Sequence, residues 1–328
     1  MTARTLMNLP AFIDYEHGIT AIDSGFERPM LDAVHLVVEG GRAALVDTAS
    51  NESLPKVLAA LAAKGLSAGN VDWVLLTHVH LDHAGGAGAY MRHFPNARLT
   101  VHPRGARHMI DPARLVAGTV DVYGAEEARR MYGDIVPVPA ERVVETPDGA
   151  SVSLNGRRFE FLDTPGHARH HVCIVDERSG HVFAGDTFGL SYRELDVGGR
   201  PAIFPSTTPV QFDPPALHDS IDRLLARRPG AVYVTHFGQV RDVQRCGADL
   251  HRLIDAHAAL GLDCEGDGVA GERRSQRLRE GVRAMVLDEA QRQRWPLARE
   301  ALLALFDLDI RLNAAGIESW LDARAARG

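Results

Sequence analysis

The chain has 328 residues, 45% of them hydrophobic, which is enough apolar material for a large globular core. Its formal net charge is −7 and its pI is about 6.1, so it lacks the basic surface with which nucleic-acid-binding proteins displace counterions. We therefore expect a small-molecule partner and no nucleic acid.

The cysteines and the first residues of the chain indicate in which cellular compartment the protein is expected. Cys173, Cys246 and Cys264 lie far apart without a C-x-x-C pair, so neither a disulfide framework nor a cysteine zinc site is predicted. The first ten residues lack the apolar core of a signal peptide, and no later apolar run is long enough to span a bilayer. We expect a cytoplasmic protein without a membrane partner.

Two series of strands and helices follow one another along the chain. In the first half, apolar periodicity and turn residues predict strands over 19–23, 33–39, 43–47, 71–76 and 98–101, and helices over 54–65, 87–94, 106–110 and 126–132. In the second half they predict strands over 151–154, 158–162, 172–175, 181–184 and 231–235, and helices over 216–227, 242–260, 273–293 and 297–324. This order indicates two packed βα halves that share a cleft.

The last quarter of the chain is predicted to be helical. Residues 261–271 are rich in Gly and Asp, so we expect a hinge there, between a domain of residues 1–260 and a helical extension of residues 261–328. Trp295, Phe306 and Trp320 are spaced for packing. The extension is expected to cover one flank of the cleft or to make a homodimer contact.

Residues 77–86 carry the strongest chemical signal. Four metal-ligand side chains, His78, His80, Asp82 and His83, fall within six positions, between an apolar strand and a helix opened by two glycines. In an extended H-x-H segment both imidazoles point to the same side, so they can reach one ion. Isolated histidine pairs are usually structural, but this density favours a metal site.

Later strand ends add one ligand-type residue each. His167 follows Thr-Pro-Gly, Asp186 follows Gly185, and His236 follows Thr235. Together with the histidine cluster they make seven available ligands. The number is sufficient for two metal ions.

These motifs, T-H-x-H-x-D-H-x-G-G, T-P-G-H, G-D-T and a final strand-end histidine, resemble the metallo-β-lactamase superfamily over residues 19–237. The resemblance implies a four-layer αββα sandwich with a dinuclear site at one edge. It implies a first metal site of His78, His80 and His167, a second of Asp82, His83 and His236, and Asp186 as the bridge. Asp47, at an early strand end, would orient the ligand loop.

Other residues are weaker candidates. His171 matches a second histidine found in T-P-G-H-x-x-x-H members and would support the ligands, as would His170, although a structural hydrogen bond is the favoured role for both. Tyr192 could donate to a developing oxyanion, as a tyrosine does in related lactonases. His102, at another strand end, could contact substrate. A pocket wall is the more common role for such a tyrosine, and for His102 a position near the cleft without substrate contact is equally expected.

The resemblance implies a hydrolase that attacks an ester-like carbonyl, such as a thioester, a lactone or a small ester, with Asp82 orienting the nucleophile. Imidazole and carboxylate ligands suit Zn²⁺, Fe²⁺ and Mn²⁺, and zinc is our first expectation. The alternatives are a diiron protein that binds or reduces oxygen, a phosphoester or organophosphate hydrolase, a nuclease, and a non-catalytic binding module. A β-lactamase is disfavoured, because the best-known subclass has cysteine where Asp186 stands here.

Overall fold

The computed structural model describes residues 12–326, which divide into two compact units. Unit 1 comprises the chain up to Asp163, His170–Gly185 and Pro229–Gln239, and unit 2 comprises Thr164–Arg169, Asp186–Arg228 and the chain from Val240. The expectation about a signal peptide falls on residues outside the described range.

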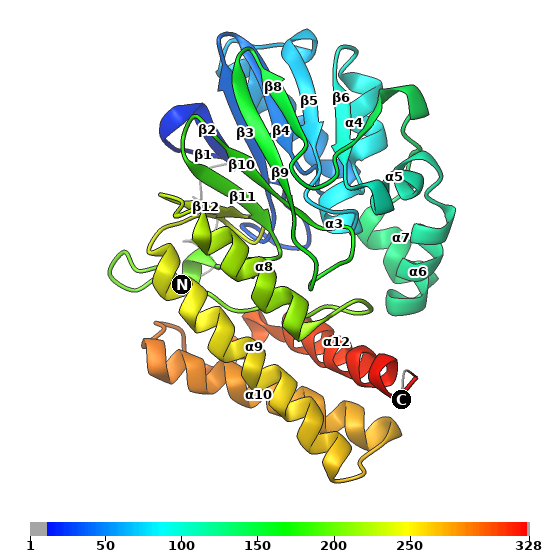
Figure 1. The fold of residues 1–328 in the computed structure, drawn as a ribbon, viewed down its shortest axis with the longest axis vertical. Helices are drawn as coiled ribbons and strands as arrows, with labels where there is room; N and C mark the ends of the chain where they lie inside the picture. Colours follow the sequence, from blue (N-terminus) through cyan, green and yellow to red (C-terminus); the bar gives the residue numbers. More distant parts are fainter. Residues whose placement is uncertain (1–11, 327–328) are drawn as a thin grey trace. The chain divides into compact units, whose positions relative to one another are not determined.

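Unit 1 is built on two β-sheets, most of whose strands are labelled in Figure 1. The first sheet contains, in spatial order, β1 (Phe12–Asp14), β2 (Ile19–Asp23), β3 (Ala33–Glu39), β4 (Arg42–Val46), β5 (Val71–Leu75), β6 (Arg98–Val101) and β7 (Val143–Glu145). The second contains β13 (Gly238–Val240), β12 (Val232–Val234), β11 (His181–Gly185), β10 (Val172–Asp176), β9 (Arg157–Asp163) and β8 (Ser151–Leu154). From β4 to β7 neighbouring strands are parallel, as are β11 and β12.

The helices of unit 1 are mostly short. They are α2 (Leu54–Ala63), α3 (Leu81–Ala84), α4 (Ala87–His93), α5 (Pro103–Ile110), α6 (Ala113–Tyr123) and α7 (Ala125–Tyr132), with the 3-10 turns η1 (Glu16–Gly18), η2 (Asn51–Ser53), η3 (Ala68–Asn70) and η4 (Ala140–Arg142). The 106–110 and 126–132 helices are thus present, and α6 between them is an addition. Val116, Gly118 and Val120 lower the helix propensity of α6, which buries no residue fully, so the sequence signal was weak.

The first sheet is buried on both faces because its strands alternate between two apolar clusters. Leu36 of β3 and Val74 of β5 pack against helix residues such as Tyr90 of α4. Their neighbours Val37 and Leu75 face the second sheet. The unit therefore has a helix layer, the first sheet and the second sheet, with one core on each side of the first sheet.

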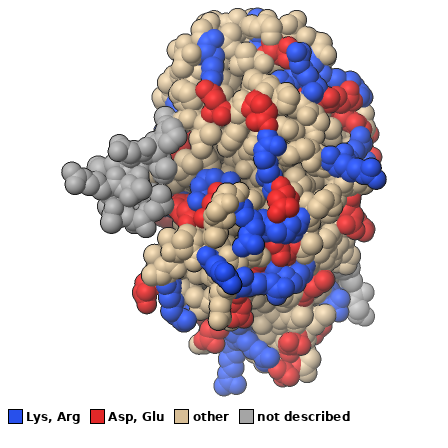
Figure 2. All heavy atoms as spheres, turned by 90° about the vertical axis from the view of Figure 1, so that its left-hand side faces the viewer, with Lys and Arg blue, Asp and Glu red and all other residues tan. Residues whose placement is uncertain are grey.

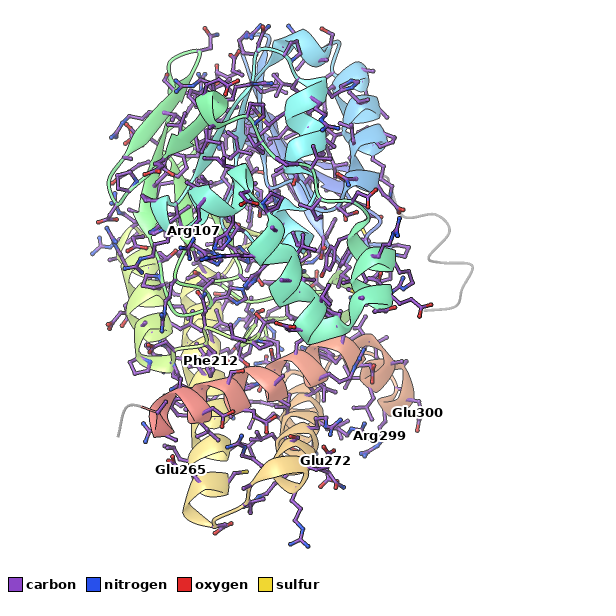
Figure 3. All side chains as sticks on the ribbon, turned by 90° about the vertical axis from the view of Figure 1, so that its right-hand side faces the viewer. Arg107, Phe212, Glu265, Glu272, Arg299 and Glu300 are labelled. Atoms are coloured by element: carbon purple, nitrogen blue, oxygen red, sulfur yellow. The ribbon has the colours of Figure 1, made fainter. Side chains whose placement is uncertain are left out.

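Unit 2 contains the longest helices. They are α8 (Pro214–Ala226), α9 (Val243–Gly266), α10 (Gly271–Gln293), α11 (Arg299–Leu305) and α12 (Asp307–Ala325), preceded by the turn η5 (Arg193–Leu195). In Figure 3, Glu265 and Glu272 mark the two sides of the turn between α9 and α10, and Arg299 and Glu300 mark the start of α11. Helix α12 packs on α9 and α10. Its Trp320 meets Phe212, which lies just before α8, edge to face.

The hinge predicted at residues 261–271 is wrong in its first half, because α9 continues through Gly261 to Gly266. A Cβ at Gly261 would lie 2.8 Å from Ile317 Cγ2 and 3.2 Å from the Trp320 ring. The glycine therefore allows α9 and α12 to approach closely, and it does not break the chain. The boundary predicted at 260/261 falls inside this helix.

The helices, the surface charges and the cysteines of the described residues bear on the expectations about membranes, nucleic acid and disulfides. No helix within 12–326 combines the length and apolarity needed to cross a membrane. On the face drawn in Figure 2, basic and acidic side chains are interspersed. The three cysteines, all within the described residues, are buried and form no disulfide.

A buried histidine between the sheets makes stability sensitive to acid. His35 of β3 is 2% exposed and packs edge to face on Phe183 and Tyr233, and its Nε2 has no hydrogen-bond partner among the described residues. Burial lowers the pKa of His35 from 6.5 to about 4. Between these two values the unfolded chain binds a proton that the folded chain does not, so folded stability falls as the pH falls.

Wild type should lose free energy of unfolding between about pH 7.5 and about pH 4.5. We predict that this loss is smaller in His35→Leu by up to about 3 kcal/mol, the energy that corresponds to the shift of the His35 pKa. Urea unfolding at both pH values measures the difference between variant and wild type. His93→Gln, which changes an exposed histidine, is the control. An equal acid sensitivity of His35→Leu and wild type would contradict the assignment.

Candidate metal centre

The candidate site of unit 1 begins where parallel strands end. Val46 of β4 pairs with Leu75 of β5 in a parallel register, so Asp47 and Thr77, just beyond the two strands, lie at the same edge of the sheet. The Asp47 carboxylate, 1% exposed, accepts hydrogen bonds from Thr77 N at 2.8 Å and from Thr77 Oγ1 at 2.8 and 3.0 Å. This pairing fixes the start of the histidine segment.

His78 and His80 converge in the short segment between the end of β5 and the start of α3. Thr77 Oγ1 donates its single hydrogen to Asp47, so it accepts from His78 Nδ1, 3.2 Å away. Nε2 of His78 then carries a lone pair, and it lies 2.9 Å from Nδ1 of His80. The two nitrogens therefore share a proton or a cation.

His83 is held by both its backbone and its ring. Thr48 donates to its carbonyl oxygen from N at 2.7 Å and from Oγ1 at 3.0 Å. A Cβ at Gly86, three residues on, would lie 2.9 Å from Ser50 O, so only glycine allows α3 and α4 to pack this closely on the 48–50 loop. Nδ1 of His83 donates to Asp47 Oδ2 at 2.9 Å, which leaves the lone pair on Nε2.

His236 reaches the cluster from the end of β12 and is aligned by Asp32. Its Nδ1 lies 2.7 Å from Asp32 Oδ1 and 3.3 Å from Leu31 O, both acceptors, so its Nε2 also carries the lone pair. Burial raises the pKa of the Asp32 carboxyl to about 6, while the adjacent His236 lowers it. The contact with His236 thus favours the ionised form of Asp32, which accepts.

The donor set fits a metal ion. Asp82 Oδ2 lies 3.6 Å from Nε2 of His83 and 3.8 Å from Nε2 of His236, and the ligand atoms of these three residues all lie within 4.8 Å of one another. His83 and His236 use Nδ1 to donate elsewhere, so their Nε2 lone pairs converge on a partly exposed carboxylate. Such a group is repulsive unless a cation lies in its middle.

Unit 2 contains a second, smaller arrangement of the same kind. Nδ1 of His167 donates to Ser206 O at 3.1 Å, and its Nε2 lies 3.5 Å from Asp186 Oδ2. Ser206 Oγ donates to the same carboxylate oxygen at 3.1 Å. His167 and Asp186, both buried, are thereby oriented as an imidazole and carboxylate pair.

The weaker candidates of unit 1 are all buried. His171 lies against His78, with ring centroids 4.9 Å apart, and His170 meets His80 edge to face at 5.7 Å. His102 caps α5, since its Nδ1 accepts from Arg104 N at 3.0 Å, and its Nε2 lies 3.3 Å from Asp163. Burial lowers the pKa of His102, which Asp163 opposes.

Tyr192, the remaining candidate, belongs to unit 2 and is 1% exposed. Its hydroxyl donates to the Asp309 carboxylate of α12, with 3.0 and 3.1 Å to the two oxygens, and its ring packs on Phe306. The Tyr192 hydroxyl thus uses its hydrogen in a bond to Asp309 within unit 2. Its role toward substrate stays a prediction.

Several residues that orient the ligands were not identified from the sequence. Thr77 and Thr235 both donate to Asp47, the latter at 3.1 Å, and each directly precedes a ligand-type histidine. That repeated Thr-His pair was a usable signal. Asp32 and Ser206 had none, because their partners are distant in the sequence.

Comparisons with known proteins agree with this fold. The sequence model of the metallo-beta-lactamase superfamily matches residues 32–236. A hydroxyacylglutathione hydrolase from Xanthomonas campestris pv. campestris (strain B100) is 29% identical over 292 residues, which cover 89% of this chain and 85% of that protein.

Two solved structures share the architecture. The metallo-beta-lactamase family protein TTHA1429 from Thermus thermophilus aligns with a TM-score of 0.61 at 22% identity, over 97% of this chain and 95% of that one. The archaeal superfamily protein ST1585 from Sulfolobus tokodaii aligns with a TM-score of 0.60 at 22% identity, over 73% and 86%. The expected mixed α/β fold, with two sheets and a C-terminal helical region, is confirmed. With the family model covering well over half its length, the chain belongs to the metallo-beta-lactamase superfamily.

Proposed function

We propose that this protein is a metal-dependent hydrolase that attacks an ester-like carbonyl and cleaves its bond to sulfur or oxygen, with thioesters as the first substrate class. The observation that carries the proposal is the convergence of Nε2 lone pairs from His83 and His236 on the Asp82 carboxylate. An imidazole and carboxylate set of this kind binds borderline divalent metals, and membership of the superfamily supports their use in hydrolysis.

We propose two ions, with the ligands that the sequence motifs imply. His78, His80 and His167 would hold one, Asp82, His83 and His236 the other, and Asp186 would bridge them. No thiolate is among these ligands, so zinc, iron and manganese all fit, and zinc remains our first choice. The hydrogen bonds of Asp47 and Asp32 support the proposal, because they fix the tautomers that ligation requires.

The residues of unit 1 would each contribute to the reaction in a distinct way. Ions bound there would lower the pKa of a water molecule and polarise the substrate carbonyl. Asp82, whose side chain is 24% exposed, is accessible enough to orient that water and to accept its proton. His83 and His236, tied to Asp47 and Asp32, would keep their geometry while charge develops.

The thioester class is supported by the relatives. Proteins named hydroxyacylglutathione hydrolase from Xanthomonas campestris and Aeromonas salmonicida are 29% and 30% identical to this chain. A thioester and a lactone present similar carbonyl carbons, so lactones and small esters follow as the next classes. The substrate would be a small molecule of the cytoplasm, and homodimer formation stays a prediction.

The competing function is oxygen binding or reduction at a diiron centre of the same fold. The same nitrogen and oxygen ligands accept iron. Aerobic absorption spectra of the iron-loaded protein separate the two functions. An oxygen-dependent charge-transfer band together with no activity on any ester would overturn the hydrolase proposal.

We predict that two substitutions reduce metal binding to different degrees. His80→Ala removes the nitrogen that faces His78, so about one equivalent of metal should be lost and kcat/KM should fall by about 10²-fold or more. Asp32→Asn keeps the shape but weakens the acceptor for His236, so metal affinity should fall by about 10- to 100-fold. Metal analysis after dialysis and competition with a chelator measure both effects.

His93→Gln is the matched control for these substitutions, because it removes an exposed imidazole from the end of α4. It should retain full metal content and activity. A His80→Ala protein that kept both would show that the ligand assignment is wrong.

We predict that chelator treatment abolishes hydrolysis and that added Zn²⁺ restores it, since the nucleophilic water depends on the ions. On a panel of S-acyl thioesters, lactones and phosphoesters, thioesters should give the highest kcat/KM. Preference for a phosphoester would overturn the carbonyl assignment, and activity that survived metal removal would overturn the metal mechanism.

A further inference from the structure

Unit 1 contains a second cluster of metal-ligand side chains that the proposed reaction does not use. Glu16 and His17 of η1 and His181 at the start of β11 each offer one ligand atom, and these atoms all lie within 4.8 Å of one another. The two imidazole rings meet edge to face, with centroids 5.3 Å apart and planes at 84°. We propose that Glu16, His17 and His181 bind one divalent transition-metal ion, such as Zn²⁺, as a clip between the two sheets.

This cluster lies at the edge of the sheets opposite to the candidate centre. Ile19, at the start of β2 and next to η1, pairs with Val37 near the end of β3. Asp32, which contacts the candidate ligand His236, directly precedes the start of β3. His181 opens β11, and the strand ends four residues later at Gly185, about 13 Å away at the rise of a strand. The two groups of ligands are therefore separate.

His17 is held in an unusual backbone conformation. Its φ of 62° is in the left-handed region, which non-glycine residues rarely adopt. Arg157 Nη1 donates to the His17 carbonyl at 2.7 Å, and Arg157 is itself buried in a two-armed ion pair with Asp176 of β10. A Cβ at Gly18 would lie 2.6 Å from Val38 O, so the turn fits tightly on β3. Such a conformation persists only where its surroundings fix it, and here it presents the imidazole beside His181.

The ring of His181 is held as that of a metal ligand would be. The residue is 4% exposed, and its Nδ1 lies 3.2 Å from the Tyr233 hydroxyl. That hydroxyl is itself fixed, because it accepts from Gln239 Nε2 at 2.9 Å. Metal-binding histidines almost always use the second ring nitrogen in a hydrogen bond that fixes the ring, and in the tautomer that donates from Nδ1 to Tyr233 the lone pair of Nε2 would serve the ion.

The ligand chemistry indicates which ions fit. Two imidazoles and one carboxylate are the ligand set of several three-ligand zinc sites, where water completes a tetrahedron. The same set accepts Ni²⁺ and Cu²⁺, and it disfavours Mg²⁺ and Ca²⁺, which prefer all-oxygen surroundings. Because η1 precedes a strand of the first sheet and β11 belongs to the second, a bound ion would join the sheets and stabilise the folded state by mass action.

The test uses the full-length protein with its catalytic metals already bound, so that only additional binding is measured. Isothermal titration with Zn²⁺ and metal analysis after dialysis should give one further equivalent for wild type. The double variant Glu16→Gln/His17→Gln changes two exposed side chains, so it should fold normally and lose that equivalent. His93→Gln is the matched control and should retain it.

Thermal unfolding gives an independent readout. Added Zn²⁺ should raise the Tm of the metal-loaded wild type and of His93→Gln, but not that of the double variant, and Mg²⁺ should have no effect on any of them. Hydrolytic activity should be the same in all three proteins, so failure of the proposed function leaves this test intact. Equal Zn²⁺ stoichiometry in wild type and double variant would overturn the proposal, as would a Tm increase that survives the substitutions.

Discussion

The Asp47 carboxylate is the interaction on which the candidate centre depends. A buried carboxylate is destabilising unless donors surround it, and Asp47 accepts from Thr77, His83 and Thr235, which follow or lie near three different elements. Its own φ of 58° is left-handed, so the backbone too is adapted to this position. One charge thereby fixes the ends of β4, β5 and β12 and the tautomer of a ligand.

The same parallel topology explains why the chemistry gathers at one edge. Parallel neighbours deliver their carboxyl ends together, and both sheets contain such a pair at the place where ligands follow. Loops at that edge can present polar groups while the strands behind them remain apolar. The opposite edge carries Glu16, His17 and His181, and Arg157 donates to the His17 carbonyl. A further ion bound there would act on stability and leave the chemistry unchanged.

Local patterns predicted ten of the described strands, most helices and the density of ligand-type residues in 77–86, because periodicity and turn chemistry act over few residues. They missed β1, β7 and β13, which are only three residues long. The strands predicted over 151–154 and 158–162 are one such success, and the turn between them is made by Asn155 and Gly156, both with positive φ. What the sequence did not reveal depends on distant partners. Gly261 suggested a chain break, but contact with Ile317 and Trp320 makes it a packing residue inside α9. Asp32 gained its role only because the fold brings His236 to it.

Tautomers also link metal binding to stability. With Nδ1 of His83 and His236 turned to Asp47 and Asp32, their Nε2 atoms and the partly exposed Asp82 carboxylate form a group whose charge a cation would neutralise. Protonating one imidazole would satisfy the charge but would give up a ligand. Binding free energy is then also folding free energy, so the ions that activate water would at the same time hold this edge of unit 1 together.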